Sequence, residues 1–189
     1  MDPGVWGPSA WALVHAVAEN VKTRNVGAVH KWFATFDRVL PCPKCQRSYV
    51  EHIRLLPIPT VPGEFGRWAY ELHNRVNITK RVPLREWPSY EVVSEVKLGE
   101  GRLKRLNNLR GENVWVFLNA VALICSCTRD FWLLLPDVLD TFAHQEAIAI
   151  KEFVKRNPID KKNMVAWVQR MAGGTHMVLS VKCDTVCSA

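Results

Sequence analysis

Apolar side chains recur along this chain at the three- and four-residue steps of amphipathic helices. In the first such segment Trp11, Val14 and Val21 follow this spacing. Pro41 ends the second segment, and Pro43 suits the first turn of the third. The predicted helices cover residues 8–23, 28–40, 43–55, 64–79 and, as a short fifth helix, 90–98. No convincing strand alternation is present, so the pattern predicts an all-α fold.

A second apolar block begins near Val114 and resembles a degenerate copy of the first. Trp11 and Trp115 stand in similar apolar runs, 104 residues apart. Beyond them an offset of 99 aligns Trp32-Phe33 with Phe131-Trp132, Val39-Leu40 with Val138-Leu139, and Trp68 with Trp167. One offset held over a long stretch favours a repeat over chance sharing of Trp and Ala.

The copy does not repeat the polar residues of the first half. Cys42 and Cys45 fall opposite Thr141 and His144, and His73 and Asn74 fall opposite Ala172 and Gly173. We therefore expect a first half that carries chemistry and a second half that keeps only the packing. The predicted organisation is a helical domain over 1–98, a basic linker over 99–112 and a helical pseudo-repeat over 113–189.

Composition excludes several classes of protein. The chain has 189 residues, of which 48% are hydrophobic and 23% charged, so disordered, collagen-like and low-complexity chains are excluded. The net charge of +7 favours an anionic partner or cofactor, although no nucleic-acid motif is present. The longest apolar run, Val114–Cys125, is too short to span a membrane, and Met1-Asp2-Pro3-Gly4 does not begin a secretory signal. We expect a protein that is not secreted.

The six cysteines come as three close pairs, which indicates metal or redox chemistry more than structural bridges. In Cys42-Pro43-Lys44-Cys45 the two thiols can bond across one helical turn. A helix N-terminus and a neighbouring Lys both stabilise a thiolate. Half of a four-cysteine zinc site is the other interpretation of this motif.

Two further groups are candidates for ligand binding. Gly7, Trp11 and His15 share one helix face and can form a wall for a planar ligand, or simply belong to a core helix with one satisfied His. His73, Val76 and Asn77 share another face. The basic residues that follow can neutralise phosphates, or can be an ordinary solvated helix end.

Taken together, the three motifs resemble the Erv/ALR family of FAD-linked sulfhydryl oxidases. The residues concerned are Trp6-Gly-x-x-x-Trp11-x-x-x-His15, then Cys42-x-x-Cys45, then His73-Asn74-x-Val76-Asn77. The resemblance implies a four-helix bundle plus a short fifth helix that holds FAD beside the C-x-x-C motif. It also implies that electrons pass from protein dithiols to Cys42 and Cys45, then to FAD, then to oxygen, giving hydrogen peroxide.

The resemblance also implies roles for individual residues. Cys42 would exchange with the substrate, and Cys45 would be the thiolate next to the flavin. The residues expected to line the FAD are Gly7, Trp11, His15, Tyr49, Trp68, His73, Asn74, Val76, Asn77 and Lys80. Cys183 and Cys187 form a candidate shuttle pair on the C-terminal tail, whereas Cys125 and Cys127 are more simply explained as packing cysteines. No metal site is expected.

The chain departs from the family in three ways. No Cys occurs between Cys45 and Cys125, so the bridge that pins the fifth helix in many members is missing. Ser48 stands in a stretch where a His is common. The second half is absent from short members, and it suggests a pseudo-dimer that replaces the usual homodimer partner. This arrangement resembles sulfhydryl oxidases of baculoviruses and related large DNA viruses, so we expect a viral member in the host cytoplasm, nucleus or virion.

Two alternatives stay open at the level of sequence. One is a zinc-binding interaction module built from the cysteine pairs with His144 or His176. The other is a catalytically inactive helical scaffold that keeps the motifs as relics. Whether pseudo-dimers pair further into a homodimer is also open.

Overall fold

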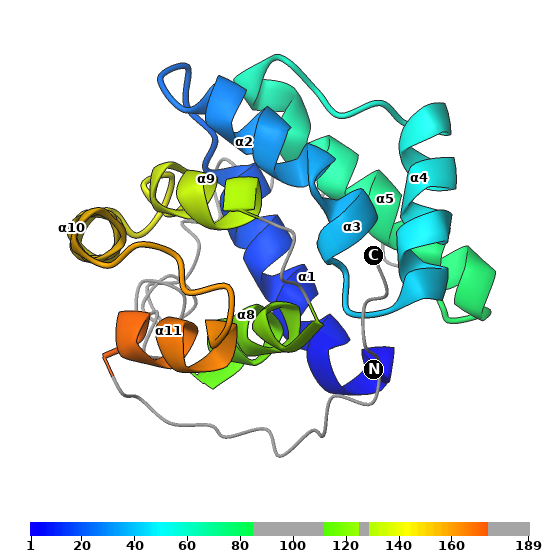
Figure 1. The fold of residues 1–189 in the computed structure, drawn as a ribbon. Helices are drawn as coiled ribbons and strands as arrows, with labels where there is room; N and C mark the ends of the chain where they lie inside the picture. Colours follow the sequence, from blue (N-terminus) through cyan, green and yellow to red (C-terminus); the bar gives the residue numbers. More distant parts are fainter. Residues whose placement is uncertain (85–111, 125–128, 174–189) are drawn as a thin grey trace.

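The computed structural model describes residues 1–84, 112–124 and 129–173 (Figure 1). Within these ranges every regular element is a helix, which confirms the all-α fold class. No helix in this part of the chain has the length and apolar character that crossing a bilayer requires. The predicted short helix at 90–98 and nearly all of the predicted linker lie outside the described residues.

The first half contains the four long helices that the pattern predicts, with changed boundaries. They are α1 (Pro3–Glu19), α2 (Val26–Ala34) with the short α3 (Phe36–Val39), α4 (Pro43–Leu55), and α5 (Phe65–Lys80), which follows the single 3-10 turn η1 (Pro62–Glu64). The bounds predicted for α4 are confirmed. The bounds predicted for α5 differ from the observed ones by one residue at each end. The prediction for α1 was wrong by four or five residues at each end, and the prediction for the second helix missed a break.

Local hydrogen bonds explain two of these differences. The predicted helix over 8–23 begins at Pro3, because the Asp2 carboxylate caps it by accepting from the backbone N–H of Gly4 at 2.8 Å. The predicted helix over 28–40 breaks at Thr35, whose hydroxyl donates to the carbonyl of Trp32 at 2.7 Å. Competition of this kind from a Thr side chain interrupts helices.

The second half begins with α8 (Glu112–Ile124) and α9 (Arg129–Leu139), followed by α10 (His144–Arg156) and α11 (Met164–Met171). In Figure 1, α8 and α11 lie beneath α9, and α10 lies at the edge farthest from α4. α1 packs against α8, and α2 packs against α9. The sequence offsets align residues of α1 with residues of α8, and residues of α2 with residues of α9. These are the same helix pairs that meet across the two halves.

Corresponding contacts also occur inside each half. α1 contacts α5 in the first half, and α8 contacts α11 in the second. The indole N–H of Trp68 donates to the carbonyl of Leu56, just after α4, at 3.1 Å. The indole N–H of Trp167 donates to the carbonyl of Asn157, just after α10, also at 3.1 Å. These two tryptophans are the pair that the offset of 99 aligns.

A single hydrophobic cluster runs through both halves. At its centre the ring of Trp32 stacks on that of Phe131, with 5.1 Å between centroids and 23° between planes. Both rings are fully buried, and both come from positions that the offset of 99 aligns. Neither half has a separate core, because each contributes large side chains to the same contact region.

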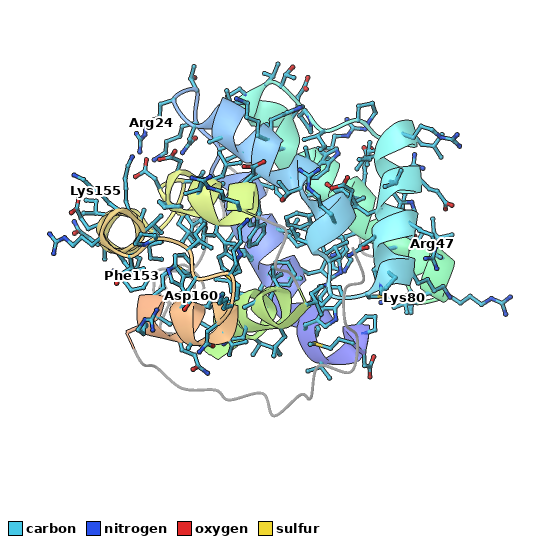
Figure 2. All side chains as sticks on the ribbon, viewed as in Figure 1. Arg24, Arg47, Lys80, Phe153, Lys155 and Asp160 are labelled. Atoms are coloured by element: carbon cyan, nitrogen blue, oxygen red, sulfur yellow. A yellow bond between two sulfur atoms is a disulfide. The ribbon has the colours of Figure 1, made fainter. Side chains whose placement is uncertain are left out.

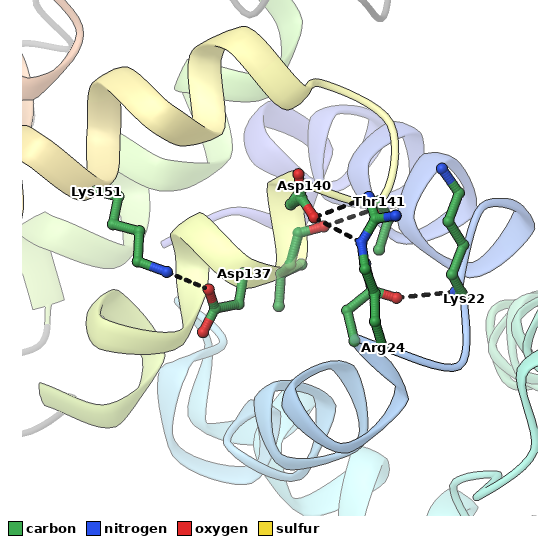
Figure 3. A network of polar contacts seen from close by, with 8 residues as sticks. Lys22, Arg24, Asp137, Asp140, Thr141 and Lys151 are labelled. Atoms are coloured by element: carbon green, nitrogen blue, oxygen red, sulfur yellow. Dashed lines mark hydrogen bonds and ion pairs between the residues drawn. The ribbon is translucent and has the colours of Figure 1, made fainter.

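Polar contacts also join the halves. The guanidinium of Arg24, in the loop after α1, donates to the carboxylate of Asp140 at 3.0 and 3.2 Å (Figure 3). Nearby, within the second half, the ammonium of Lys151 on α10 lies 3.2 Å from the carboxylate of Asp137 on α9. The cations of both pairs are largely exposed to solvent, so each pair contributes at most about 1 kcal/mol.

Candidate active site

The two cysteines of the C-x-x-C motif form a disulfide across the first turn of α4. Pro43 occupies the first helical position, and Cys42 immediately before it has an extended backbone, which is the conformation of an N-cap residue. The Sγ of Cys42 accepts a hydrogen bond from the backbone N–H of Cys45 at 3.2 Å. This N–H and the positive end of the helix favour a thiolate at Cys42 when the bond is reduced.

Side chains on α4 fix this turn against the rest of the first half. The side-chain amide of Gln46 donates to the carbonyls of Leu40 at 2.9 Å and Arg38 at 3.2 Å. One turn further on, the hydroxyl of Tyr49 donates to the carbonyl of Phe33 at 2.9 Å. The disulfide is thereby held in a defined position relative to α2 and α3.

Two residues predicted to line the cofactor lie in the hydrophobic core instead. Tyr49 is 5% exposed, and burial, with a smaller effect of Asp37, raises the pKa of its hydroxyl, which therefore stays a protonated donor to Phe33. Trp68 is 3% exposed, and its ring packs on that of Phe33 at 4.8 Å between centroids. Neither ring offers a free face for stacking, so both positions support the helices around the site.

Three other predicted residues meet in one cluster, although they come from opposite ends of the first half. The indole of Trp11 on α1 stacks on the imidazole of His73 on α5, with centroids 3.8 Å apart and planes 2° apart. The Nε2 of His15 lies 2.9 Å from the Nδ1 of His73, so one ring donates to the other. Residues 58 positions apart thus form a wall of flat, hydrogen-bonding rings.

The remaining predicted residues lie on the same two helices as this wall, α1 and α5. Gly7 lies one turn before Trp11 on α1, and a Cβ there would meet nothing within 4 Å, so the position is open. Asn77 is 7% exposed, and its amide lies 3.4 Å from the carbonyl of Pro83. Asn74 and Val76 are partly buried on α5, and Lys80 is exposed at the end of the helix.

The structure adds residues that the motif comparison missed. On α4 the hydroxyl of Ser48 lies 3.2 Å from the Nε2 of His52. Partial burial lowers the pKa of His52, and the charge of Arg75 on α5 lowers it further, against a smaller opposite effect of Glu51. Arg75 on α5 is therefore near enough for its charge to act on His52. The four-residue spacing of Ser48 and His52 is the sequence signal for this pair.

The donor set fits FAD. The indole of Trp11 is partly exposed and suits a ring system of the cofactor, whereas His73 is 6% exposed and supports Trp11 from behind by stacking on it. Amides at Asn74 and Asn77 suit the polar edges of the cofactor, and cations such as Lys80 suit its diphosphate. The described residues contain no cluster of three or more His, Cys, Asp or Glu placed to hold a metal ion. The candidate shuttle pair Cys183 and Cys187, together with Cys125 and Cys127, lies outside the described residues.

Comparison with known proteins agrees with this geometry. Residues 8–89 match the model of the Erv1/Alr family. The chain is 32% identical over 82 residues to the mitochondrial FAD-linked sulfhydryl oxidase ERV1 of Saccharomyces cerevisiae, covering 41% of this chain and 43% of that protein. It is 29% identical over 85 residues to the protein named "Probable FAD-linked sulfhydryl oxidase R368" of Acanthamoeba polyphaga mimivirus, covering 41% and 59%.

A third relative, from Invertebrate iridescent virus 6, also bears the name of an FAD-linked sulfhydryl oxidase and is 27% identical over 96 residues, covering 44% of this chain and 86% of that protein. The chain thus spans about half the length of the first two relatives. No solved structure matches the chain. The three motifs and these matches together show that residues 8–89 of the chain are similar to the Erv1/Alr family and to proteins named as FAD-linked sulfhydryl oxidases.

Proposed function

We propose that this protein is an FAD-linked sulfhydryl oxidase that forms disulfides in protein dithiols. The observation that carries the proposal is the Cys42–Cys45 disulfide at the start of α4, in the same Erv1/Alr-like region as the Trp11–His15–His73 wall. The names of the relatives describe the same activity. When bound, FAD accepts the electron pair of the reduced cysteines and passes it to oxygen, which becomes hydrogen peroxide.

The two cysteines divide the thiol chemistry between them. A substrate thiolate attacks the Sγ of Cys42, and the Cys42–Cys45 bond breaks as Cys45 leaves as a thiolate. The second substrate thiolate attacks the substrate sulfur of the mixed disulfide and releases Cys42. The N–H of Cys45, 3.2 Å from the Sγ of Cys42, stabilises the departing thiolate in this second step.

Residues of α1 and α5 hold the cofactor in this proposal. The partly exposed indole of Trp11 binds a flat part of the cofactor by stacking, and the buried His73 supports this indole from its other side. The imidazole of His15 fixes the orientation of His73 through their hydrogen bond. Asn74 and Asn77 bind its polar edges, and Lys80 neutralises phosphate charge. Tyr49 and Trp68 act only by holding α4 and α5 in place.

We further propose that the second half replaces a partner subunit, so that the chain is a pseudo-dimer with one FAD. Its support is the pairing of α1 with α8 and of α2 with α9, and the contact between the aligned residues Trp32 and Phe131. Self-complementary contacts between corresponding elements are typical of two-fold interfaces. The residues opposite His73 and Asn74 are Ala172 and Gly173, which offer neither ring nor amide.

Two of the relatives are viral proteins. We propose on this basis that the chain is a viral sulfhydryl oxidase acting in the host cytoplasm, the nucleus or the virion. Fractionation of cells that express the chain, followed by immunoblotting, tests this placement. Recovery only from the secretory pathway or the medium would contradict it.

The visible absorption spectrum of the purified protein tests the proposed activity first. We expect a flavin spectrum, release of about one FAD per chain on denaturation, and oxygen consumption with dithiothreitol. Cys45→Ser abolishes turnover, whereas the matched variant Cys125→Ser, outside the C-x-x-C motif, retains it. A folded protein that stays colourless after incubation with FAD would refute the proposal. Stoichiometric zinc in a metal assay would favour the interaction module instead.

A further inference from the structure

The surface next to the redox disulfide is cationic. Lys44 and Arg47 are exposed in the first two turns of α4, and Arg54 is exposed at its far end. None of these three cations forms an ion pair with a residue that the structure describes. Glu51 is the one carboxylate on α4. We call Lys44, Arg47 and Arg54 the α4 cationic face.

Further cations lie on the neighbouring elements. The exposed Arg38 on α3 lies next to the first turns of α4, because the amide of Gln46 donates to the Arg38 carbonyl at 3.2 Å. Its guanidinium is paired with the carboxylate of Asp37 at 3.9 Å. The exposed Lys80 lies on the same side of the molecule as Arg47, but we have assigned it to the phosphates of the cofactor (Figure 2). The positive charge that a substrate meets at the disulfide therefore comes mainly from α4.

We propose, on the basis of the sulfhydryl oxidase function, that the α4 cationic face selects protein dithiols flanked by Asp and Glu residues. Exposed charges interact over roughly one Debye length, about 10 Å at 0.1 M salt. Lys44 lies inside the C-x-x-C motif and Arg47 lies two residues after it, so the residues next to a substrate thiol fall within that range of these two cations. Arg54 lies about 18 Å along the helix from Cys42 and contributes only to the longer-range field. Complementary charge of this kind mainly raises the rate of productive encounter.

The charges also assist the exchange step. Carboxylates beside a substrate thiol raise its pKa and reduce the fraction of thiolate, the attacking species. On binding, Lys44 and Arg47 offset this effect, and the thiolate forms close to the Sγ of Cys42. The substrate dithiol gives up two electrons and two protons and gains one disulfide, while Cys42 and Cys45 take up the electron pair. Under the proposed function, bound FAD and oxygen then remove this pair.

The test uses the flavin-loaded full-length protein and two synthetic dithiol peptides that differ only in their flanking residues, Asp and Glu in one and Lys in the other. Oxygen consumption gives kcat/KM for each peptide, and dithiothreitol serves as the uncharged reference. We expect the acidic peptide to be preferred by about threefold or more at low salt. The preference should shrink in 0.5 M NaCl because screening removes it.

Two variants of opposite sign sharpen the test. Arg47→Glu should lower the ratio of acidic to basic peptide, and Glu51→Lys, one turn away on the same face, should raise it. The matched control is Lys155→Glu on α10, an exposed position on the opposite side of the molecule (Figure 2), and it should leave the ratio unchanged. All three are solvent-exposed substitutions, so the fold should be retained.

Equal kcat/KM for the two peptides would overturn the substrate preference. The same ratio of acidic to basic kcat/KM in Arg47→Glu and in Lys155→Glu would also overturn it. If the protein still oxidised dithiothreitol in either case, the proposed oxidase function would stand. A flavin-loaded protein that is inactive toward dithiothreitol would overturn the oxidase function itself, and this inference with it.

Discussion

Phe131 tests whether the two halves of the chain stabilise each other. This residue of the second half is fully buried, and its ring lies 5.1 Å from Trp32 and 6.3 Å from Phe36, both in the first half. Phe131→Ala removes a buried ring and leaves a cavity, which costs about 3–5 kcal/mol in unfolding free energy. Since folded domains have only about 5–15 kcal/mol in total, this loss is large.

Leu133 on the same helix is the matched control. Its side chain is 42% exposed, so Leu133→Ala changes the unfolding free energy by only about 0.5 kcal/mol. Urea unfolding should be followed by tryptophan fluorescence, far-UV circular dichroism and release of bound flavin. Because the core is shared, we expect Phe131→Ala to shift all three transitions together.

The flavin signal decides the question, because the residues proposed to bind the cofactor all belong to the first half. If flavin release has the same urea midpoint in Phe131→Ala as in Leu133→Ala, the stability of the first half does not depend on the second half. Separate transitions for flavin release and helix loss would likewise show that the halves unfold independently.

Other expectations concern single contacts. Trp68→Phe removes the indole donor to the carbonyl that follows α4, and Trp167→Phe removes the donor to the carbonyl that follows α10. Each variant should lower the unfolding free energy by about 1–3 kcal/mol in urea titrations. Unequal losses would argue against equivalent roles for the two tryptophans. The folded protein lowers the pKa of His52 and so disfavours its protonated form, and the free energy of unfolding therefore falls as pH drops below about 6.5. His52→Gln should lessen this fall in thermal melts at pH 7 and 5, and an unchanged fall would contradict the reasoning. Arg24→Ala should cost at most about 1 kcal/mol, and a loss that persists in 1 M NaCl would contradict a screened surface pair.

Motif spacing located much of the candidate site, because short-range geometry follows from the helix itself. Cys42 and Cys45 are three residues apart around a helix start, and two prolines fix where that start lies, so their closeness is a local property. Trp11 and His15 share a face of α1 for the same reason. The stacking of Trp11 on His73 is different, since it depends on how α1 and α5 pack.

Tyr49 and Trp68 show what residue type alone leaves undecided. An aromatic ring near a cofactor motif can stack on the cofactor or fill the core, and its own sequence neighbourhood does not distinguish these outcomes. The hydrogen bonds from Tyr49 to Phe33 and from Trp68 to Leu56 decide the matter, and both partners lie more than ten residues away in the sequence. The charge of Arg75 likewise acts on His52 from another helix.

The sequence by itself determined the helical class, the start of α4, the redox pair and the family motifs, because each depends on periodicity or on residues within one or two helical turns. The tertiary structure decided which aligned helices meet, that Trp32 and Phe131 share one core, and which rings remain at the site. Those outcomes depend on side-chain shape and burial across distant segments, and residue spacing along a single chain carries no direct record of them.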